Sequence, residues 1–127
     1  MIKFNKLLKA IFYFTNLILI LIYLYPGSIF GYILYNDFEK QPQITADFLN
    51  FSSNHFYSFA FLAVTGILAF LRDKKVYFIV KYLFLISIIL ELFHLVIPAR
   101  MFEFADLLGN ILGVLTIFII YKILKYN

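Results

Sequence analysis

The sequence contains no cysteine, and only 14% of its 127 residues are charged. Without cysteine the chain can form no disulfide and can perform no thiol redox chemistry. Soluble domains carry about 25% charged residues. A chain this small with 64% hydrophobic residues cannot cover its apolar surface with polar groups. The same hydrophobicity excludes an intrinsically disordered protein. The composition therefore indicates a protein of the membrane.

The chain instead contains long apolar stretches. A hydrocarbon core of about 30 Å requires roughly 20 helical residues. We predict membrane-spanning helices at residues 7–25, 55–71, 76–97 and 102–121, with Pro98 ending the third and an outer loop at residues 26–54. Within that loop, the aromatic residues 29–38 are expected along the membrane interface and residues 39–47 in solvent. The expected fold is all-α, a single domain of residues 1–127 forming a bundle of four transmembrane helices.

The basic residues predict the orientation of this bundle. If the N-terminus is cytoplasmic, only Lys40 and Arg100 of the 11 Lys and Arg residues lie on the outer side. Short loops rich in Lys and Arg stay in the cytoplasm, so we predict that both termini are cytoplasmic. The net charge of +4 then reflects orientation, and we expect no nucleic-acid partner. The cytoplasmic set comprises Lys3, Lys6, Lys9, Arg72, Lys74, Lys75, Lys81, Lys122 and Lys125.

Ionisable side chains gather near the outer ends of the predicted helices. His55 begins the second helix, Glu91 and His94 share one face of the third, and Asp106 and Asn110 share one face of the fourth. Charges inside a membrane are costly and by default indicate function. The helical rise places Glu91 about 9 Å below the outer end of its helix and level with Asn110, and His94 level with Asp106. All five are candidate ligand-binding residues, and Glu91, His94 and Asp106 are also candidate acid–base groups.

The outer turn and the fourth helix add two further features. Arg100 is a candidate ligand-binding residue, expected to pair with Glu103 or Asp106 or to bind an external anion. Gly109 and Gly113 form a G-x-x-x-G pattern, which lets another helix approach closely, and they are interpreted as helix-packing residues.

A metal site is a competing interpretation of the same polar residues. Glu91 and His94, together with His55 and Asp106, supply enough nitrogen and oxygen ligands for a metal site in a helix bundle. Acid–base pairing explains the same residues, and no complete metal motif is present. We therefore expect no metal and no cofactor.

The order and spacing of these motifs resemble the VanZ-like family of small multi-pass membrane proteins, over residues 54–118. The resemblance rests on His55-Phe56, Glu91, Pro98-Ala99-Arg100 and the stretch of residues 106–113, DLLGNILG. The chain differs in having Ser52-Ser53-Asn54 where the family often has an Asp-Lys pair, and His94 where it often has Gln. The family is named for a factor in teicoplanin resistance, so the resemblance implies a multi-pass protein of the bacterial plasma membrane, but no settled reaction.

Three functions remain open at this point. The preferred one is a non-enzymatic factor of the cell envelope, whose outer pocket binds an anionic head group or a cell-wall-related ligand with Arg100 as the clamp. The second is a membrane enzyme that acts on a lipid-linked substrate by acid–base chemistry between a carboxylate and a histidine. The third is a small proton-linked transporter or channel subunit. The lipid bilayer is the expected partner, and the oligomeric state and any role in antibiotic resistance stay open.

Overall fold

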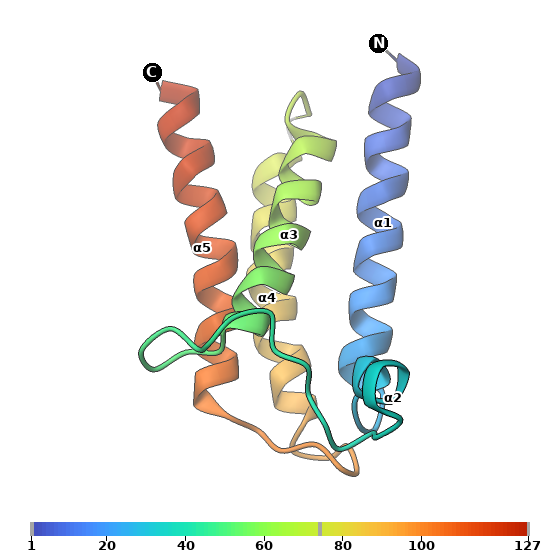
Figure 1. Cartoon of the computed structure of the whole chain (residues 1–127). Helices are drawn as coiled ribbons and strands as arrows, with labels where there is room; N and C mark the ends of the chain where they lie inside the picture. Colours follow the sequence, from blue (N-terminus) through green and yellow to red (C-terminus); the bar gives the residue numbers. More distant parts are fainter. Residues whose placement is uncertain (1, 74, 127) are drawn as a thin grey trace.

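The structure, a computed structural model, describes residues 2–73 and 75–126. These residues form the helices α1 (Ile2–Leu24), α2 (Ile29–Tyr35), α3 (Ser53–Phe70), α4 (Val76–Phe93) and α5 (Phe104–Tyr126). Four of these helices, all except α2, are long and apolar enough to cross a membrane. The prediction of an all-α membrane protein with four spans is confirmed, and both ends of the chain lie at the same end of the bundle (Figure 1).

The third predicted helix is shorter than expected. We predicted residues 76–97, but α4 ends at Phe93. The amide groups of His94, Leu95 and Val96 bond to carbonyls three residues back, at 3.0–3.1 Å, so the chain makes one tighter turn before Pro98. Proline causes this early end, because its ring would clash with the carbonyl of His94 in a continued α-helix.

The first and last helices are longer than predicted. The α1 helix begins at Ile2 instead of residue 7, and α5 continues to Tyr126 instead of ending at residue 121. Hydropathy indicates the part of a helix that lies in lipid, whereas lysine is also a good helix former and lets the helix continue past it. The helices α1 and α5 therefore extend beyond their apolar segments.

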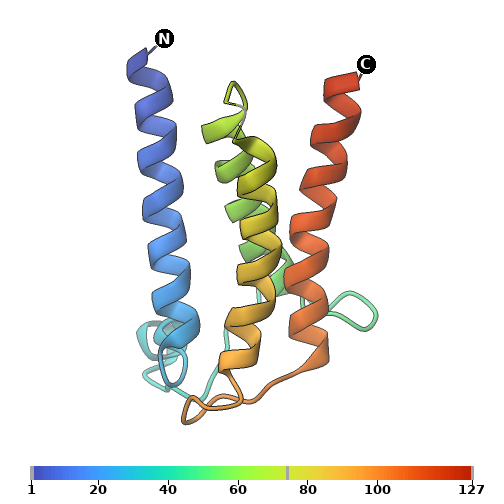
Figure 2. The ribbon, with the colours of Figure 1, turned by 180° about the vertical axis from the view of Figure 1, so that it is seen from behind.

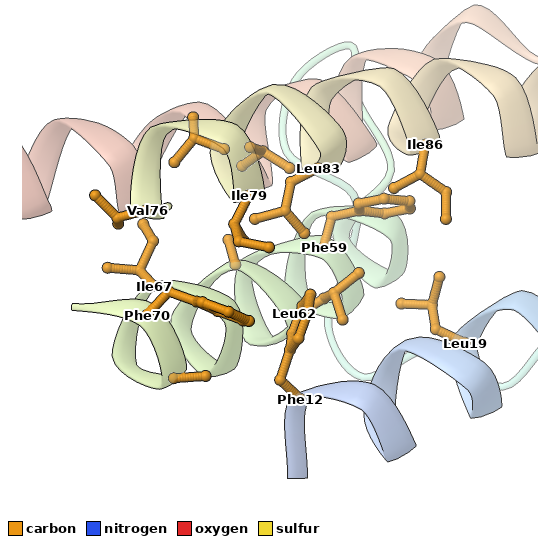
Figure 3. Close-up of a cluster of buried hydrophobic side chains, with 14 of the residues drawn as sticks. Phe12, Leu19, Phe59, Leu62, Ile67, Phe70, Val76, Ile79, Leu83 and Ile86 are labelled. Atoms are coloured by element: carbon orange, nitrogen blue, oxygen red, sulfur yellow. The ribbon is translucent and has the colours of Figure 1, made fainter. Parts of the chain in front are cut away.

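The four long helices pack around an apolar core. The α3 and α4 helices lie between α1 and α5 in both views of the ribbon (Figures 1 and 2). Phe59 and Leu62 of α3 and Leu83 of α4 are fully buried, with Phe12 of α1 packed against them (Figure 3). Because lipid is as apolar as this core, van der Waals contact rather than a hydrophobic driving force holds the helices together.

The closest helix contact joins α3 and α5 at two glycines. A Cβ atom added to Gly109 would lie 2.6 Å from the carbonyl oxygen of Ser52, and one added to Gly113 would lie 2.5 Å from the carbonyl oxygen of Phe56. Both neighbours are backbone atoms and cannot rotate away. The two backbones can therefore approach this closely only because residues 109 and 113 have no side chain.

This contact predicts a large effect of a single methyl group. We expect Gly113→Ala to lower the free energy of unfolding by about 1–3 kcal/mol, because α3 and α5 must move apart. Gly66→Ala is the matched control, since its nearest neighbours are side-chain atoms of Phe12 and Ile79 that can shift. Thermal unfolding in detergent measures both variants, and an equal loss of stability in the two would contradict this account.

The loop between α2 and α3, predicted to lie on the outer side, is hydrogen-bonded to the start of α3. The side chain of Asn54 accepts a hydrogen bond from the amide of Ile44 and donates one to the carbonyl of Pro42. Ser52 is the N-cap residue of α3, but its side chain makes no capping hydrogen bond. Instead, the carboxylate of Asp47 accepts a hydrogen bond of 3.0 Å from the backbone amide of Ser53, which has no partner within the helix. Residues 42–54 are therefore held in place, and residues 39–47, predicted as a solvated loop, are exposed apart from the half-buried Pro42.

The short helix α2 occupies part of the predicted interfacial segment. Ser28 caps its start by accepting the amide of Gly31 at 2.9 Å, and Asn36 ends it in the left-handed conformation. It lies beside the C-terminal end of α1 (Figure 1). Its side chains at positions 30 and 32–35 are exposed and apolar or aromatic, which suits a location at the membrane interface.

An ion pair joins α1 to the turn between α3 and α4 at the opposite end. Lys9 Nζ lies 3.3 Å from Asp73 Oδ2, and the amide of Lys75 donates to Asp73 Oδ1. The hydrogen bond from the Lys75 amide has the largest effect on the pKa of Asp73, and together with the contact to Lys9 it holds this pKa below its ordinary value. Lys74, one of the predicted cytoplasmic basic residues, lies outside the described residues.

Candidate functional site

Asn110 of α5 is the centre of a buried hydrogen-bond network. It is 0% exposed, and its Nδ2 donates to the carbonyl of Ser87 in α4 at 3.1 Å, which fixes the orientation of the amide. Its Oδ1 then points to α1 and α3, where it accepts from the Tyr23 hydroxyl at 2.9 Å and lies 3.0 Å from His55 Nδ1. One side chain therefore joins all four long helices.

The imidazole of His55 fits this network in either neutral tautomer. Its Nδ1 donates to Asn110 Oδ1 when it carries the hydrogen, and it accepts from the Tyr23 hydroxyl, 3.0 Å away, when it does not. The other nitrogen, Nε2, lies 3.4 Å from Asp106 Oδ2. When Nδ1 carries the hydrogen, the lone pair on Nε2 faces a carboxylate oxygen, which is repulsive unless a shared proton or a cation lies between the two atoms.

Glu91 lies behind His55 and is fully buried. Its Oε1 accepts the amide of Glu103 at 3.2 Å and lies 3.3 Å from His94 Nδ1. Its Oε2 lies 3.8 Å from His55 Nδ1 and has no hydrogen-bond partner among the described residues. Buried polar atoms are almost always bonded, and a carboxylate oxygen without a partner is costly. The arrangement is therefore incomplete without a further group at Oε2.

His94 joins this cluster to the backbone of α1. Its Nε2 lies 3.1 Å from the carbonyl oxygen of Tyr23, and its ring stacks on the Tyr23 ring at 5.8 Å. We expected Glu91 level with Asn110, but Asn110 bonds to Ser87, one turn deeper in α4. The early end of α4 explains the shift, because it leaves Glu91 in the last turn of the helix, about 3 Å from the end instead of 9 Å.

Arg100 pairs with neither Glu103 nor Asp106, the two ion pairs expected as alternatives to binding an external anion. Its Nε donates to the carbonyl of Tyr25 at 3.1 Å and its Nη2 to the carbonyl of Ile22 at 3.0 Å. These carbonyls belong to the C-terminal end of α1, which has orphan acceptors and the negative end of the helix dipole. No carboxylate among the described residues lies within ion-pair distance of Arg100. Arg100 therefore caps a helix, a role that hydropathy and spacing did not reveal.

A cavity of about 460 Å³ lies next to this cluster. Arg100, His55 and His94 reach its wall, while Glu91 and Asp106 do not line it. Burial lowers the pKa of Arg100 from its ordinary value, but a guanidinium stays charged at neutral pH. The rest of the wall mixes amide and apolar side chains from the end of α1, from α2 and from the outer loop, including Ile22, Ile29, Leu34, Gln41, Gln43 and Asn54.

The structure thus brings together His55, Glu91, Asp106 and Asn110, with His94 beside Glu91 and Arg100 at the cavity. Sequence reasoning missed Tyr23, whose hydroxyl contacts both His55 and Asn110. The chain has 10 tyrosines, and nothing local distinguishes Tyr23 from the others. Its position near the outer end of the first span, at the depth of His55, is the only signal that could have indicated it.

Comparisons of the chain with protein-family models, with curated proteins and with solved structures return no match.

The Asn110 network predicts a clear effect on stability. We expect Asn110→Ala to lower the free energy of unfolding by about 1–3 kcal/mol, since it leaves two buried polar groups without their acceptor. Asn16→Ala is the control, because Asn16 makes one half-buried bond between α1 and α4, to the hydroxyl of Tyr82. If thermal unfolding in detergent showed the larger loss for Asn16→Ala, Asn110 would not be the centre of the network.

Proposed function

We propose that this protein is a VanZ-like factor of the bacterial plasma membrane whose outer pocket binds the anionic head group of a lipid or of a lipid-linked cell-wall precursor. The observation that carries this proposal is the position of Arg100, a permanent positive charge in the wall of a cavity at one end of four membrane-spanning helices. The motif series at residues 54–118 supports the proposed family, and the placement of the basic residues supports the proposed location.

The wall of the cavity suits a lipid head group. Two of the five N–H donors of Arg100 bond to carbonyls of α1 and hold the guanidinium in place. The remaining donors match the geometry of a phosphate or carboxylate. The amide side chains of Gln41 and Gln43 add neutral donors, while Ile22 and Leu34 offer apolar surface to the first part of an acyl chain.

The distribution of buried polar groups favours binding over proton transport. The buried polar side chains of the described residues, Ser28, Ser53, Ser87, Glu91, His94 and Asn110, lie in the half of the bundle next to Arg100. Proton transport across the membrane needs polar groups that continue toward the other side. The core between α3 and α4 near the opposite end consists instead of side chains such as Ile67, Val76 and Ile79.

The contact between His55 and Asp106 supports a membrane enzyme as the second candidate. An imidazole nitrogen 3.4 Å from a carboxylate oxygen, with its other nitrogen held by Asn110, has the orientation that acid–base catalysis needs. His55 is also the member of this pair that reaches the cavity. Turnover of a lipid-linked diphosphate by the purified protein would favour this candidate, and binding without turnover would favour the first.

The orientation is tested by reporter fusions. We expect a reporter inserted after Lys40 to be active on the outer side and one fused after Lys122 to be active in the cytoplasm, because the basic residues concentrate at the end of the bundle that contains both termini. The opposite pattern would place the cavity on the cytoplasmic side and would contradict the envelope function.

The head-group proposal is tested at Arg100. We expect Arg100→Gln to weaken binding of phosphatidylglycerol to the protein in nanodiscs by tenfold or more, since a charge-assisted hydrogen bond is worth about 1.5–3 kcal/mol. Lys40→Gln is the matched control: Lys40 carries the same charge in the outer loop, but its ammonium lies over the ring of Tyr35. Phosphatidylcholine should bind both variants and the original chain alike. If Arg100→Gln and Lys40→Gln weakened binding of phosphatidylglycerol equally, the effect would come from net charge alone, and the proposed role of Arg100 in the cavity would be contradicted.

A further inference from the structure

We propose that His55, Glu91 and Asp106 form a binding site for one divalent transition-metal ion, Zn²⁺ or Mn²⁺. The three residues come from α3, α4 and α5, and one ligand atom of each lies within 4.8 Å of the others. This site does not rest on the head-group proposal, because Glu91 and Asp106 are not part of the cavity wall.

Glu91 supplies the strongest argument. Its side chain is 0% exposed, and Oε2 has no hydrogen-bond partner, while Oε1 is held by the amide of Glu103. Holding one carboxylate oxygen orients the other. Oε2 lies 3.8 Å from His55 Nδ1, so the unsatisfied atom faces the cluster rather than lipid. A cation bound there would satisfy it.

His55 has the arrangement typical of a metal-ligating histidine. Such residues use one ring nitrogen for the metal and donate the other N–H to a carbonyl or carboxylate, which fixes the tautomer and the ring orientation. In His55, Nδ1 lies 3.0 Å from Asn110 Oδ1, which accepts its hydrogen in one of the two neutral tautomers, and Asn110 is in turn held by Ser87. In that tautomer Nε2 is free for the metal, 3.4 Å from Asp106 Oδ2.

The spacing and the charge also fit a metal ion. Bonds of about 2.0–2.2 Å in a tetrahedron separate neighbouring ligand atoms by roughly 3.3 Å, close to the distance between His55 Nε2 and Asp106 Oδ2. Two carboxylates near the membrane carry two negative charges, which a divalent ion neutralises at once, whereas a single histidine neutralises one.

The donor set selects the class of metal. One imidazole nitrogen and two carboxylate oxygens suit Zn²⁺ and Mn²⁺ better than Cu⁺, which prefers sulfur, or Ca²⁺, which takes six to eight oxygens. Three protein ligands leave a fourth position for water or for a ligand oxygen. A small ion can reach the site at its partly exposed edge, where the side chains of His55 and Asp106 are 18% and 19% exposed. Acid–base pairing, which sequence reasoning favoured, leaves Glu91 Oε2 unsatisfied, and the metal ion does not.

The test is metal binding by the purified full chain in detergent after treatment with a chelator. We expect one Zn²⁺ or Mn²⁺ per chain by calorimetry and by elemental analysis, and a rise in the thermal unfolding temperature on addition of the ion. Asp106→Asn and His55→Gln should each weaken binding by at least tenfold. Asn110→Ala, which removes the partner of Nδ1, should weaken it by about 10–100-fold.

Glu103→Gln is the matched control, since Glu103 is an exposed carboxylate that offers only its backbone amide to Glu91. This variant should bind the metal as the original chain does. Because Glu91→Gln removes a buried group and can fail to fold, the partly exposed Asp106 carries the test. The proposal is overturned if the original chain binds neither ion, or if Glu103→Gln weakens binding as much as Asp106→Asn does. Loss of head-group binding in Arg100→Gln with metal binding intact would leave this site in place.

Discussion

The close approach of α5 to α3 is the constraint on which the rest of the site depends. Gly109 and Gly113 let the backbone of α5 contact carbonyls of α3, so that Asp106 and Asn110 come within reach of His55. With larger residues at these two positions the helices would separate, and the 3.0 Å contact between Asn110 and His55 would lengthen beyond hydrogen-bond distance. Packing of small residues therefore positions the polar chemistry.

The early end of α4 is the second condition. Because the α-helix ends at Phe93, the chain turns back over the bundle within residues 94–103 and brings the amide of Glu103 to Glu91 Oε1. A helix continued to residue 97 would place Glu91 almost two turns, about 9 Å, below its end, where no backbone amide from the following turn could reach it. Pro98 thus contributes indirectly to holding a buried carboxylate.

The extent to which the sequence predicted this structure differs between the spans and the site. Hydropathy and charge predicted the four spans, because the physics of a helix in lipid depends mainly on local composition. Spacing placed Asp106 and Asn110 on one helix face, because residues three or four apart share a face. The predicted start of the second span placed His55 at the same end of the bundle. Tyr23 and the capping role of Arg100 could not be predicted in this way. Both depend on the rotation of α1 about its own axis, and α1, rich in Leu, Ile, Phe and Tyr on every side, has no periodic pattern that reveals this rotation.

The C-terminal end of α1 is held by polar groups rather than by packing alone. Arg100 caps its last carbonyls, the carbonyl of Tyr23 contacts His94, and the hydroxyl of Tyr23 contacts Asn110. The same end of α1 forms one wall of the cavity through Ile22 and Tyr23. A phosphate or carboxylate that draws the guanidinium of Arg100 toward itself must therefore compete with the carbonyls of α1. Under the proposed function, binding of an anion in the cavity and the position of α1 are consequently linked through this single side chain.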